Sequence, residues 1–120
     1  MQKVVITGHD LTVDQIIAVC REGAEVVLSD ESREKILASR QVVNELVEER
    51  KVVYGITTGF GKFSDVVISQ DECKLLQKNL IITHAVGAGD PFKEDIARGI
   101  LLLRVNSLSN GFSGICLETV

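Results

Sequence analysis

Residues 53–61 read Val53-Tyr54-Gly55-Ile56-Thr57-Thr58-Gly59-Phe60-Gly61. This stretch carries the only tyrosine of the 120-residue chain and three of its ten glycines. Glycine is entropically costly in ordered structure and is retained where the backbone needs unusual dihedral angles or close approach. A glycine loop that follows an apolar pair and exposes one phenol is typical of a site held at the end of a rigid element. The alternative is an ordinary glycine-rich turn that packs its tyrosine.

The composition around this stretch is that of one globular domain, or of a piece of a larger one. Apolar residues make up 45% of the chain and charged residues 25%, both ordinary values for a soluble protein. The net charge is −4, and lysines and arginines form no cluster. A nucleic-acid-binding protein needs a basic patch, so the charge pattern argues against this function class.

Membrane segments, disulfides and metal sites are not expected. The N-terminus turns polar at Thr7, which argues against a signal peptide, and the longest apolar run, residues 100–103, is too short to span a bilayer. The chain has only two histidines, too few for a histidine metal site. Its cysteines are odd in number and widely spaced, at Cys20, Cys73 and Cys116. This pattern favours reduced packing thiols in a cytoplasmic protein.

The N-terminal third predicts two short strands and two helices. Residues 4–6 and 25–28 have the apolar, β-branched character of strands. Between them, Thr12 and Gln15 have the spacing of a capping box, and Gly23 is a natural stop for the helix that the box opens. Ser29 can cap a further helix that runs to about residue 50. The apolar face of that helix is expected at Ile36, Leu37, Val43, Leu46 and Val47.

The remainder of the chain predicts two more helices. Ser69 and Glu72 form a second capping box, which opens a helix that reaches His84. The next helix is expected from Pro91 to about Ser109, and it is apolar almost all round, which predicts burial in a helical bundle. Residues 62–68 are ambiguous between loop and extended backbone. The fold class is therefore mainly α with a small β component near the N-terminus.

The glycine loop does not match the common phosphate-binding motifs. A P-loop requires four residues between its first glycine and the Gly-Lys pair, and Gly55 is separated from Gly61 by five. A dinucleotide fingerprint requires a third glycine where this chain has Ser64. Both nucleotide-binding hypotheses fail on spacing.

Three motifs, taken in order, resemble the aromatic amino acid ammonia-lyases. Residues 54–61 match the tyrosine motif, whose usual form is Y-G-[IV]-[NT]-T-G-F-G. Residues 76–89 are similar to the family's L-Q-x-[NS]-L…[ST]-H-x-x-G-x-G segment. Residues 104–115 are similar to its [KR]-x-N-S-L-x-x-G-[FY]-S-G segment. The resemblance covers nearly the whole chain, and the ordered set is far more specific than any single motif.

The resemblance implies a fold and a chemistry. The family has the L-aspartase/fumarase-like helical fold, forms homotetramers and eliminates ammonia from an aromatic α-amino acid. Its electrophile is the prosthetic group 4-methylidene-imidazol-5-one (MIO), made by cyclising an internal Ala-Ser-Gly. The matching tyrosine takes the substrate β-proton, so Tyr54 is the implied catalytic base. The glycines that hold it at the site are Gly55, Gly59 and Gly61.

The resemblance also points to a substrate. Phenylalanine- and tyrosine-selective relatives typically carry Phe-Leu or His-Leu where histidine-selective relatives carry Ser-His, and Thr83-His84 is closest to Ser-His. Thr83 leaves room for a ring, and His84 can hydrogen-bond an imidazole nitrogen, which implies L-histidine as substrate and urocanate as product. The alternative for His84 is that it satisfies carbonyls at its helix end. Four other polar residues are expected in structural roles: Gln77, Asn79 and Arg104 as buried residues bonded to backbone, and His9 in a turn.

One feature departs from the family pattern. The chain has no Ala-Ser-Gly, and its nearest triplet, Phe112-Ser113-Gly114, belongs to the third motif. Residues 1–120 are therefore expected to form a single N-terminal domain or fragment of a longer ammonia-lyase, with a base and a recognition residue but no electrophile. The alternatives are a fragment of a phenylalanine or tyrosine ammonia-lyase or aminomutase, and a non-catalytic module that docks on other subunits.

Overall fold

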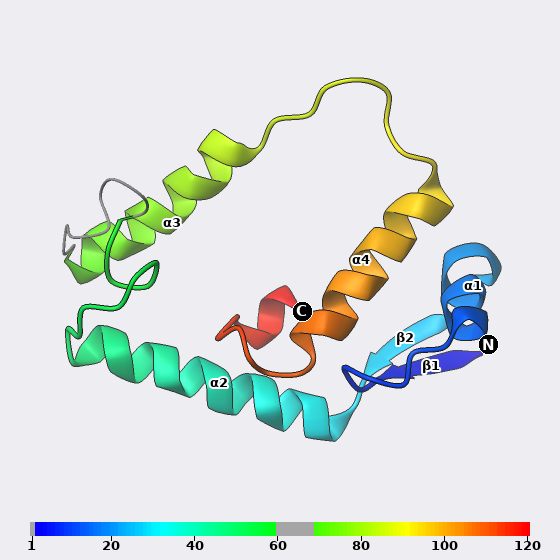
Figure 1. Cartoon of the computed structure of the whole chain (residues 1–120), viewed down its shortest axis with the longest axis horizontal. Coiled ribbons are helices and arrows are strands. Elements are labelled where there is room, and N and C mark those ends of the chain that lie inside the picture. The colour runs from blue at the N-terminus through cyan, green and yellow to red at the C-terminus, as the bar shows by residue number, and fades with distance from the viewer. Residues whose placement is uncertain (1, 60–68) are drawn as a thin grey trace. The chain divides into compact units, whose positions relative to one another are not determined.

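The computed structural model describes residues 2–59 and 69–120 and is mainly helical, with one short pair of strands (Figure 1). It divides into two compact units, one formed by residues 1–41 with 91–120 and the other by residues 42–90. Helix α2 (Asp30–Glu48) contributes residues to both. The predicted fold class is confirmed, and the ambiguous residues 62–68 lie outside the described part.

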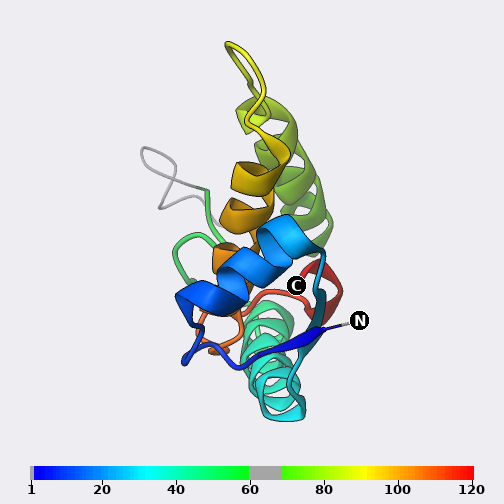
Figure 2. The same cartoon turned by 90° about the vertical axis from the view of Figure 1, so that its right-hand side faces the viewer.

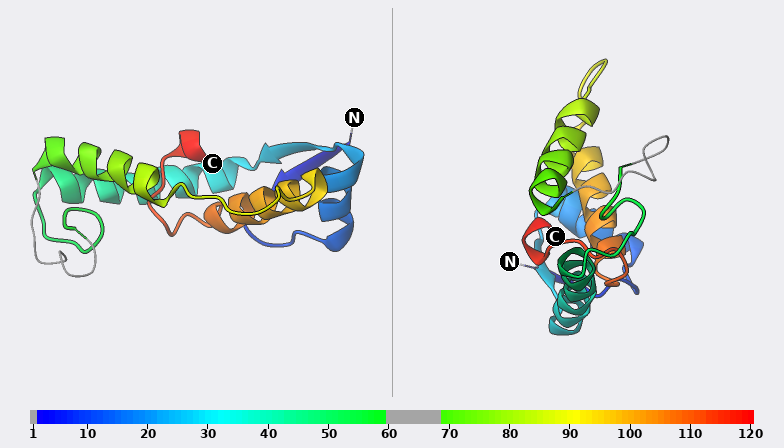
Figure 3. Two further views of the ribbon diagram at one scale, coloured as in Figure 1. Left: turned by 90° about the horizontal axis from the view of Figure 1, so that it is seen from above. Right: turned by 90° about the vertical axis from the view of Figure 1, so that its left-hand side faces the viewer.

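The first unit begins with a strand–helix–strand arrangement. Strand β1 (Lys3–Ile6) pairs in parallel with β2 (Glu25–Leu28) (Figures 1 and 3). In this register Val4 lies opposite Val26. Parallel neighbours need a crossover connection, and helix α1 (Val13–Glu22) supplies it. Val4 and Ile6 are buried while Val5 is exposed, the alternation expected of a half-buried strand. Both predicted strands are confirmed.

Helix α1 begins and ends as its sequence predicts. The backbone N–H of Gln15 donates to Oγ1 of Thr12 at 3.3 Å, and the Gln15 side chain accepts from the Thr12 N–H at 2.9 Å. This reciprocal pair satisfies two N–H groups that a helix start otherwise leaves without partners. At the other end, Gly23 adopts φ +74°, in the left-handed region that favours glycine.

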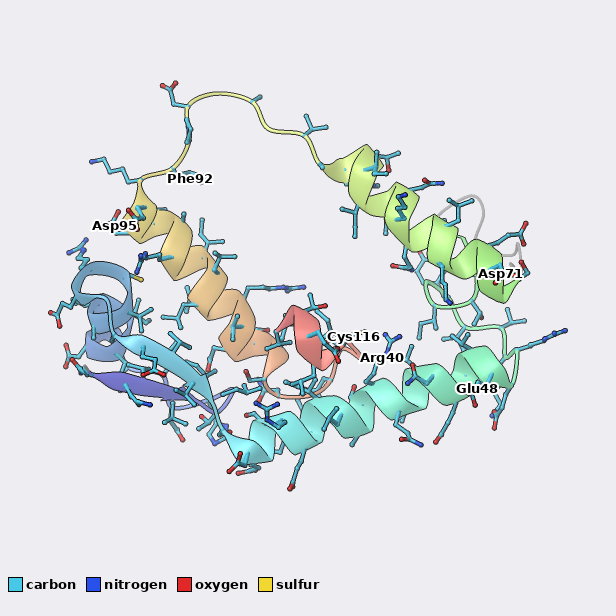
Figure 4. All side chains as sticks on the ribbon, turned by 180° about the vertical axis from the view of Figure 1, so that it is seen from behind. Arg40, Glu48, Asp71, Phe92, Asp95 and Cys116 are labelled. Carbon is cyan, nitrogen blue, oxygen red and sulfur yellow. The ribbon has the colours of Figure 1, made fainter. Side chains whose placement is uncertain are left out.

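Helix α4 (Glu94–Leu108) packs on α1 and completes the core of this unit (Figure 2). A Cβ added at Gly99 would lie 3.5 Å from the Cys20 sulfur, which shows how closely the two helices approach. Arg21 Nε lies 3.4 Å from Asp95 Oδ2, joining α1 to the first turn of α4 (Figure 4). The buried apolar cluster consists of Val4, Ile6, Val19 and Leu102.

The expectation of a helix buried on all sides is wrong for α4 in this chain. Leu102 is buried, but Leu101 is 67% exposed and Leu103 52% exposed. Within the described residues of this unit, α1 and the strands cover only one face of the helix. The helix also begins at Glu94, three residues after the predicted start, with no side-chain cap at Lys93. Composition identifies the apolar side chains but not what covers them.

The turn after α4 is held against the start of the chain and against α2. Asn110 donates from Nδ2 to the Gly8 carbonyl at 3.0 Å. Gly111 has φ +71°, and a Cβ there would lie 2.7 Å from the backbone of Lys35, so only glycine fits. The Gly114 N–H donates to Ser39 Oγ at 2.9 Å. Its carbonyl accepts from Arg40 at 3.3 Å, beside the segment that carries Cys116 and the 3-10 helix η2 (Leu117–Thr119) (Figure 4).

Helix α2 begins in the first unit and ends in the second. Ser29 caps its start as predicted, because the Ser29 hydroxyl oxygen accepts from the Ser32 N–H at 3.1 Å. At the other end, Lys51 N–H donates to the Leu46 carbonyl at 3.1 Å and Arg50 N–H to the Val47 carbonyl at 3.2 Å. This is the Schellman pattern, with Arg50 at φ +52° where glycine is usual. The predicted apolar face of α2 is confirmed at Ile36, which is buried, but not at Leu37, which is 49% exposed.

Helix α3 (Gln70–His84) follows in the second unit. Ser69 and Glu72 form the predicted capping box, with Ser69 N–H donating to Glu72 Oε2 at 3.0 Å. Among its described side chains only Leu76 and Leu80 are half-buried. The predicted burial of three polar residues is wrong, because the helix faces that carry them are open in this chain: Gln77, Asn79 and Arg104 are all exposed.

Candidate functional site

Tyr54 lies in a tight turn that follows the Schellman end of α2. The N–H groups of Ile56 and Thr57 both donate to the Val53 carbonyl, at 3.1 and 3.0 Å. Gly55 adopts φ +73°, so the residue after the tyrosine uses the conformation that glycine permits. The Tyr54 side chain is 63% exposed. The turn therefore presents the ring to the outside of the chain, and the alternative of a packed tyrosine is wrong for this chain.

Two buried threonine hydroxyls hold the turn. Thr57 Oγ1 accepts from the Val53 N–H at 2.9 Å and donates to the Lys51 carbonyl. Thr58 Oγ1 accepts from the Gly55 N–H at 3.3 Å and donates to the Gly59 carbonyl at 3.0 Å. Both threonines are at most 4% exposed. Hydroxyl bonds of this kind replace the backbone partners that an irregular loop lacks, and here they fix the backbone on both sides of Tyr54.

Lys51, three residues before Tyr54 in the sequence, pairs with Glu49. Lys51 Nζ lies 2.6 Å from Glu49 Oε2, and the hydrogen bond and charge of Glu49 raise the pKa of the Lys51 ammonium. Gly59 is buried at the end of the turn. Phe60 and the predicted loop residue Gly61 lie outside the described residues.

Thr83 and His84 form the last turn of α3, and both are exposed. His84 Nδ1 lies 2.8 Å from the Leu80 carbonyl oxygen and 3.2 Å from Thr83 Oγ1. The Thr83 hydroxyl bonds the Asn79 carbonyl at 2.8 Å. His84 thus does satisfy a carbonyl at its helix end, as the alternative expects, but it uses only one ring nitrogen to do so.

The sequence identifies Tyr54 and His84 as candidate site residues. The structure places Tyr54 in the turn after α2 and His84 at the end of α3. Sequence reasoning gave no role to the side chains of Thr57 and Thr58. The sequence does contain a sign of this role, because threonines in a glycine-rich loop commonly hydrogen-bond the local backbone. His9 lies in a bend, as expected, and its N–H donates to Thr7 Oγ1 at 3.3 Å.

No group of three or more histidine, cysteine or carboxylate side chains in residues 2–59 and 69–120 has the arrangement of a metal site. Within the same ranges, no helix combines the length and apolar character that crossing a bilayer requires.

The chain is similar to known proteins over almost its whole length. The family model described as aromatic amino acid lyase matches residues 11–120. The histidine ammonia-lyases of Caldanaerobacter subterraneus subsp. tengcongensis and Alkaliphilus oremlandii are 56% and 57% identical to it over 120 residues. The match covers 100% of this chain and 24% of each relative. The crystal structure of histidine ammonia-lyase from Trypanosoma cruzi superposes with a TM-score of 0.90 at 42% identity, covering 98% of this chain and 23% of that one.

Proposed function

The chain belongs to the aromatic amino acid lyase family, and on that premise we propose that it carries the proton-abstracting and substrate-recognition residues for eliminating ammonia from L-histidine to give urocanate. It spans about a quarter of the length of the curated relatives that it matches. The remaining active-site groups therefore come from outside these 120 residues.

In this proposal Tyr54 is the general base. Its oxygen takes the β-proton of the substrate while the ammonium group departs from the adjacent carbon. A base contributes most when it is held in one position, because misplacement by an ångström costs a large part of the rate. The support is the turn geometry: an exposed phenol lies on backbone fixed by the buried hydroxyls of Thr57 and Thr58.

Thr83 and His84 recognise the imidazole ring, and this pair is the observation that carries the choice of histidine. His84 holds its Nδ1 against the Leu80 carbonyl at 2.8 Å, which orients the ring and leaves Nε2 for a ligand. The small Thr83 side chain bonds its own helix and leaves space for a ring beside it. A hydrogen bond to imidazole favours histidine over phenylalanine, since phenylalanine cannot satisfy a desolvated polar partner.

The electrophile is proposed to be MIO, which in this family activates the substrate for loss of ammonia. The residues present do not form it. The chain has no Ala-Ser-Gly, and the nearest triplet has Phe112 in place of alanine. The glycine of that triplet, Gly114, is buried, and its N–H is already bonded to Ser39. The group must therefore come from a segment outside these 120 residues.

Two alternatives have weaker support. A phenylalanine or tyrosine lyase or aminomutase would share the fold, and the tyrosine aminomutase of Streptomyces globisporus is 34% identical to this chain. The higher identity to histidine ammonia-lyases, up to 57% among those compared, supports histidine as the substrate. A non-catalytic docking module does not by itself account for the Thr83-His84 pair, which resembles the Ser-His of histidine-selective relatives.

We also propose that the complete enzyme is a cytoplasmic homotetramer, with residues 1–120 as one N-terminal domain or fragment of each protomer. The free thiols of Cys20 and Cys116 suit a reducing compartment. The half-exposed apolar face of α4 suits burial against further helices of such an assembly.

A chimera tests the proposed function. In it, this chain replaces the matching 120 residues of the Caldanaerobacter histidine ammonia-lyase, whose other residues stay unchanged. We expect the chimera to convert L-histidine to urocanate, followed by ultraviolet absorbance, and to be much less active on L-phenylalanine and L-tyrosine. A folded chimera that prefers either of those two substrates would contradict the assignment to histidine.

A further inference from the structure

The hydrogen bonds at the end of α3 fix where the His84 proton lies. The Leu80 carbonyl oxygen can only accept a hydrogen bond, and it lies 2.8 Å from His84 Nδ1. Nδ1 must therefore carry the hydrogen. In a neutral imidazole the other nitrogen, Nε2, is then an acceptor, because the hydrogen bond made by one ring nitrogen sets the state of the other.

Thr83 reinforces this arrangement. Its hydroxyl hydrogen is directed to the Asn79 carbonyl at 2.8 Å, with the Leu80 carbonyl at 3.2 Å as a second acceptor. The oxygen of Thr83 can then only accept, and it lies 3.2 Å from the same Nδ1. Both neighbours of Nδ1 are thus acceptors, and neither favours a ring with its hydrogen on Nε2.

We propose that the neutral ring of His84 carries its hydrogen on Nδ1, as the Nδ1–H tautomer, and that the exposed Nε2 then binds a hydrogen-bond donor. Resting on the proposed function, that donor is the N–H of the substrate imidazole. The pair at the end of α3 then presents acceptors only. An imidazole whose N–H is replaced by N-methyl has no hydrogen to donate. The site should therefore distinguish imidazole from N-methylimidazole by the presence of the N–H donor and not only by the shape of the ring.

The tautomer can be measured on the 120-residue chain itself. The chain has only two histidines, and long-range ¹H–¹⁵N correlation spectra of histidine-labelled protein distinguish the two neutral tautomers. The spectrum is recorded at about pH 9, well above the range in which histidines ordinarily titrate. The variant His9→Gln assigns the signals, since His9 is exposed and its Nε2 faces Asp10 at 3.4 Å. We expect the hydrogen of His84 on Nδ1, and the Nε2–H form or an average of both forms would overturn the proposal.

Two additions test the cause and the consequence. Thr83→Val keeps the Leu80 contact, so the Nδ1–H form should persist, and its loss would show that Leu80 does not set the tautomer. Imidazole added at the same pH should shift the His84 Nε2 signal, whereas 1-methylimidazole, which has no N–H, should not. Equal shifts, or no shift with either probe, would overturn the donor-binding role. None of these readings needs turnover, so their failure is distinct from failure of the proposed function.

Discussion

The backbone N–H of Gly55 donates to Oγ1 of Thr58 at 3.3 Å, which ties the residue after the candidate base to a side chain that is 1% exposed. Thr57 does the same for the residue before it, through the Val53 N–H at 2.9 Å. The exposed Tyr54 therefore lies between two residues whose backbone N–H groups are both hydrogen-bonded to buried threonine hydroxyls. The rigidity that a general base requires has a physical source in two buried hydroxyls.

The first prediction concerns Thr57→Val, which keeps the shape of the side chain and removes the hydroxyl. The Val53 N–H and the Lys51 carbonyl lose their partner, and unsatisfied groups of this kind cost about 1–3 kcal/mol. Urea unfolding of the chain should report that loss of stability. Thr83→Val is the matched control, because Thr83 is exposed on α3 and should cost much less. Equal effects of the two substitutions would show that the Thr57 hydroxyl does not hold the turn.

The second prediction concerns acid. The side-chain and then the backbone hydrogen bonds of Ser69 hold the pKa of Glu72 below its ordinary value. A depressed folded-state pKa means that this stabilisation is present above the unfolded-state pKa and is lost as the pH falls through the folded-state value. Protection of the Ser69 N–H from hydrogen exchange should therefore decline in acid. Glu72→Gln retains the capping geometry without titrating, so its Ser69 protection should not follow this acid titration. Identical pH profiles in the two proteins would contradict this explanation.

The sequence predicted local structure better than burial, and the reason is physical. Both capping boxes and the Gly23 stop depend on residues within one turn, so local spacing suffices to find them. The exposure of Leu101 and of Gln77 depends on which segments cover a helix face, and the spacing of residues in the sequence does not predict those segments. For the site, the motifs identified Tyr54 as the candidate base, whereas the tautomer of His84 required the position of a backbone carbonyl.

The third prediction concerns the chain by itself. Residues 1–120 alone should form no urocanate from L-histidine, because they lack the segment that makes the electrophile. Absorbance at ordinary enzyme concentrations, beside a boiled sample, is the measurement. Turnover clearly above the boiled sample would refute the requirement for that segment.

The fourth prediction concerns specificity. In the chimera, His84→Leu removes a hydrogen bond to the substrate imidazole, which should cost about 1–3 kcal/mol, or roughly 5- to 150-fold in kcat/KM for histidine. Thr83→Phe combined with His84→Leu should shift preference toward phenylalanine, because an apolar face then fills the space beside the ring. The values of kcat/KM for histidine, tyrosine and phenylalanine decide the matter. An unchanged ratio of histidine to phenylalanine in His84→Leu would remove His84 from recognition.

Tyr54→Phe in the chimera tests the central claim most directly, because it keeps the ring and removes only the oxygen that takes the proton. The measurement is kcat for urocanate formation, with thermal unfolding of both proteins as the control for folding. Removing a general base should lower kcat by about 10²–10⁴-fold, and the unfolding temperature should hardly change because the ring that packs is unchanged. A stable Tyr54→Phe chimera that retains the full rate would contradict the assignment of Tyr54 as the base.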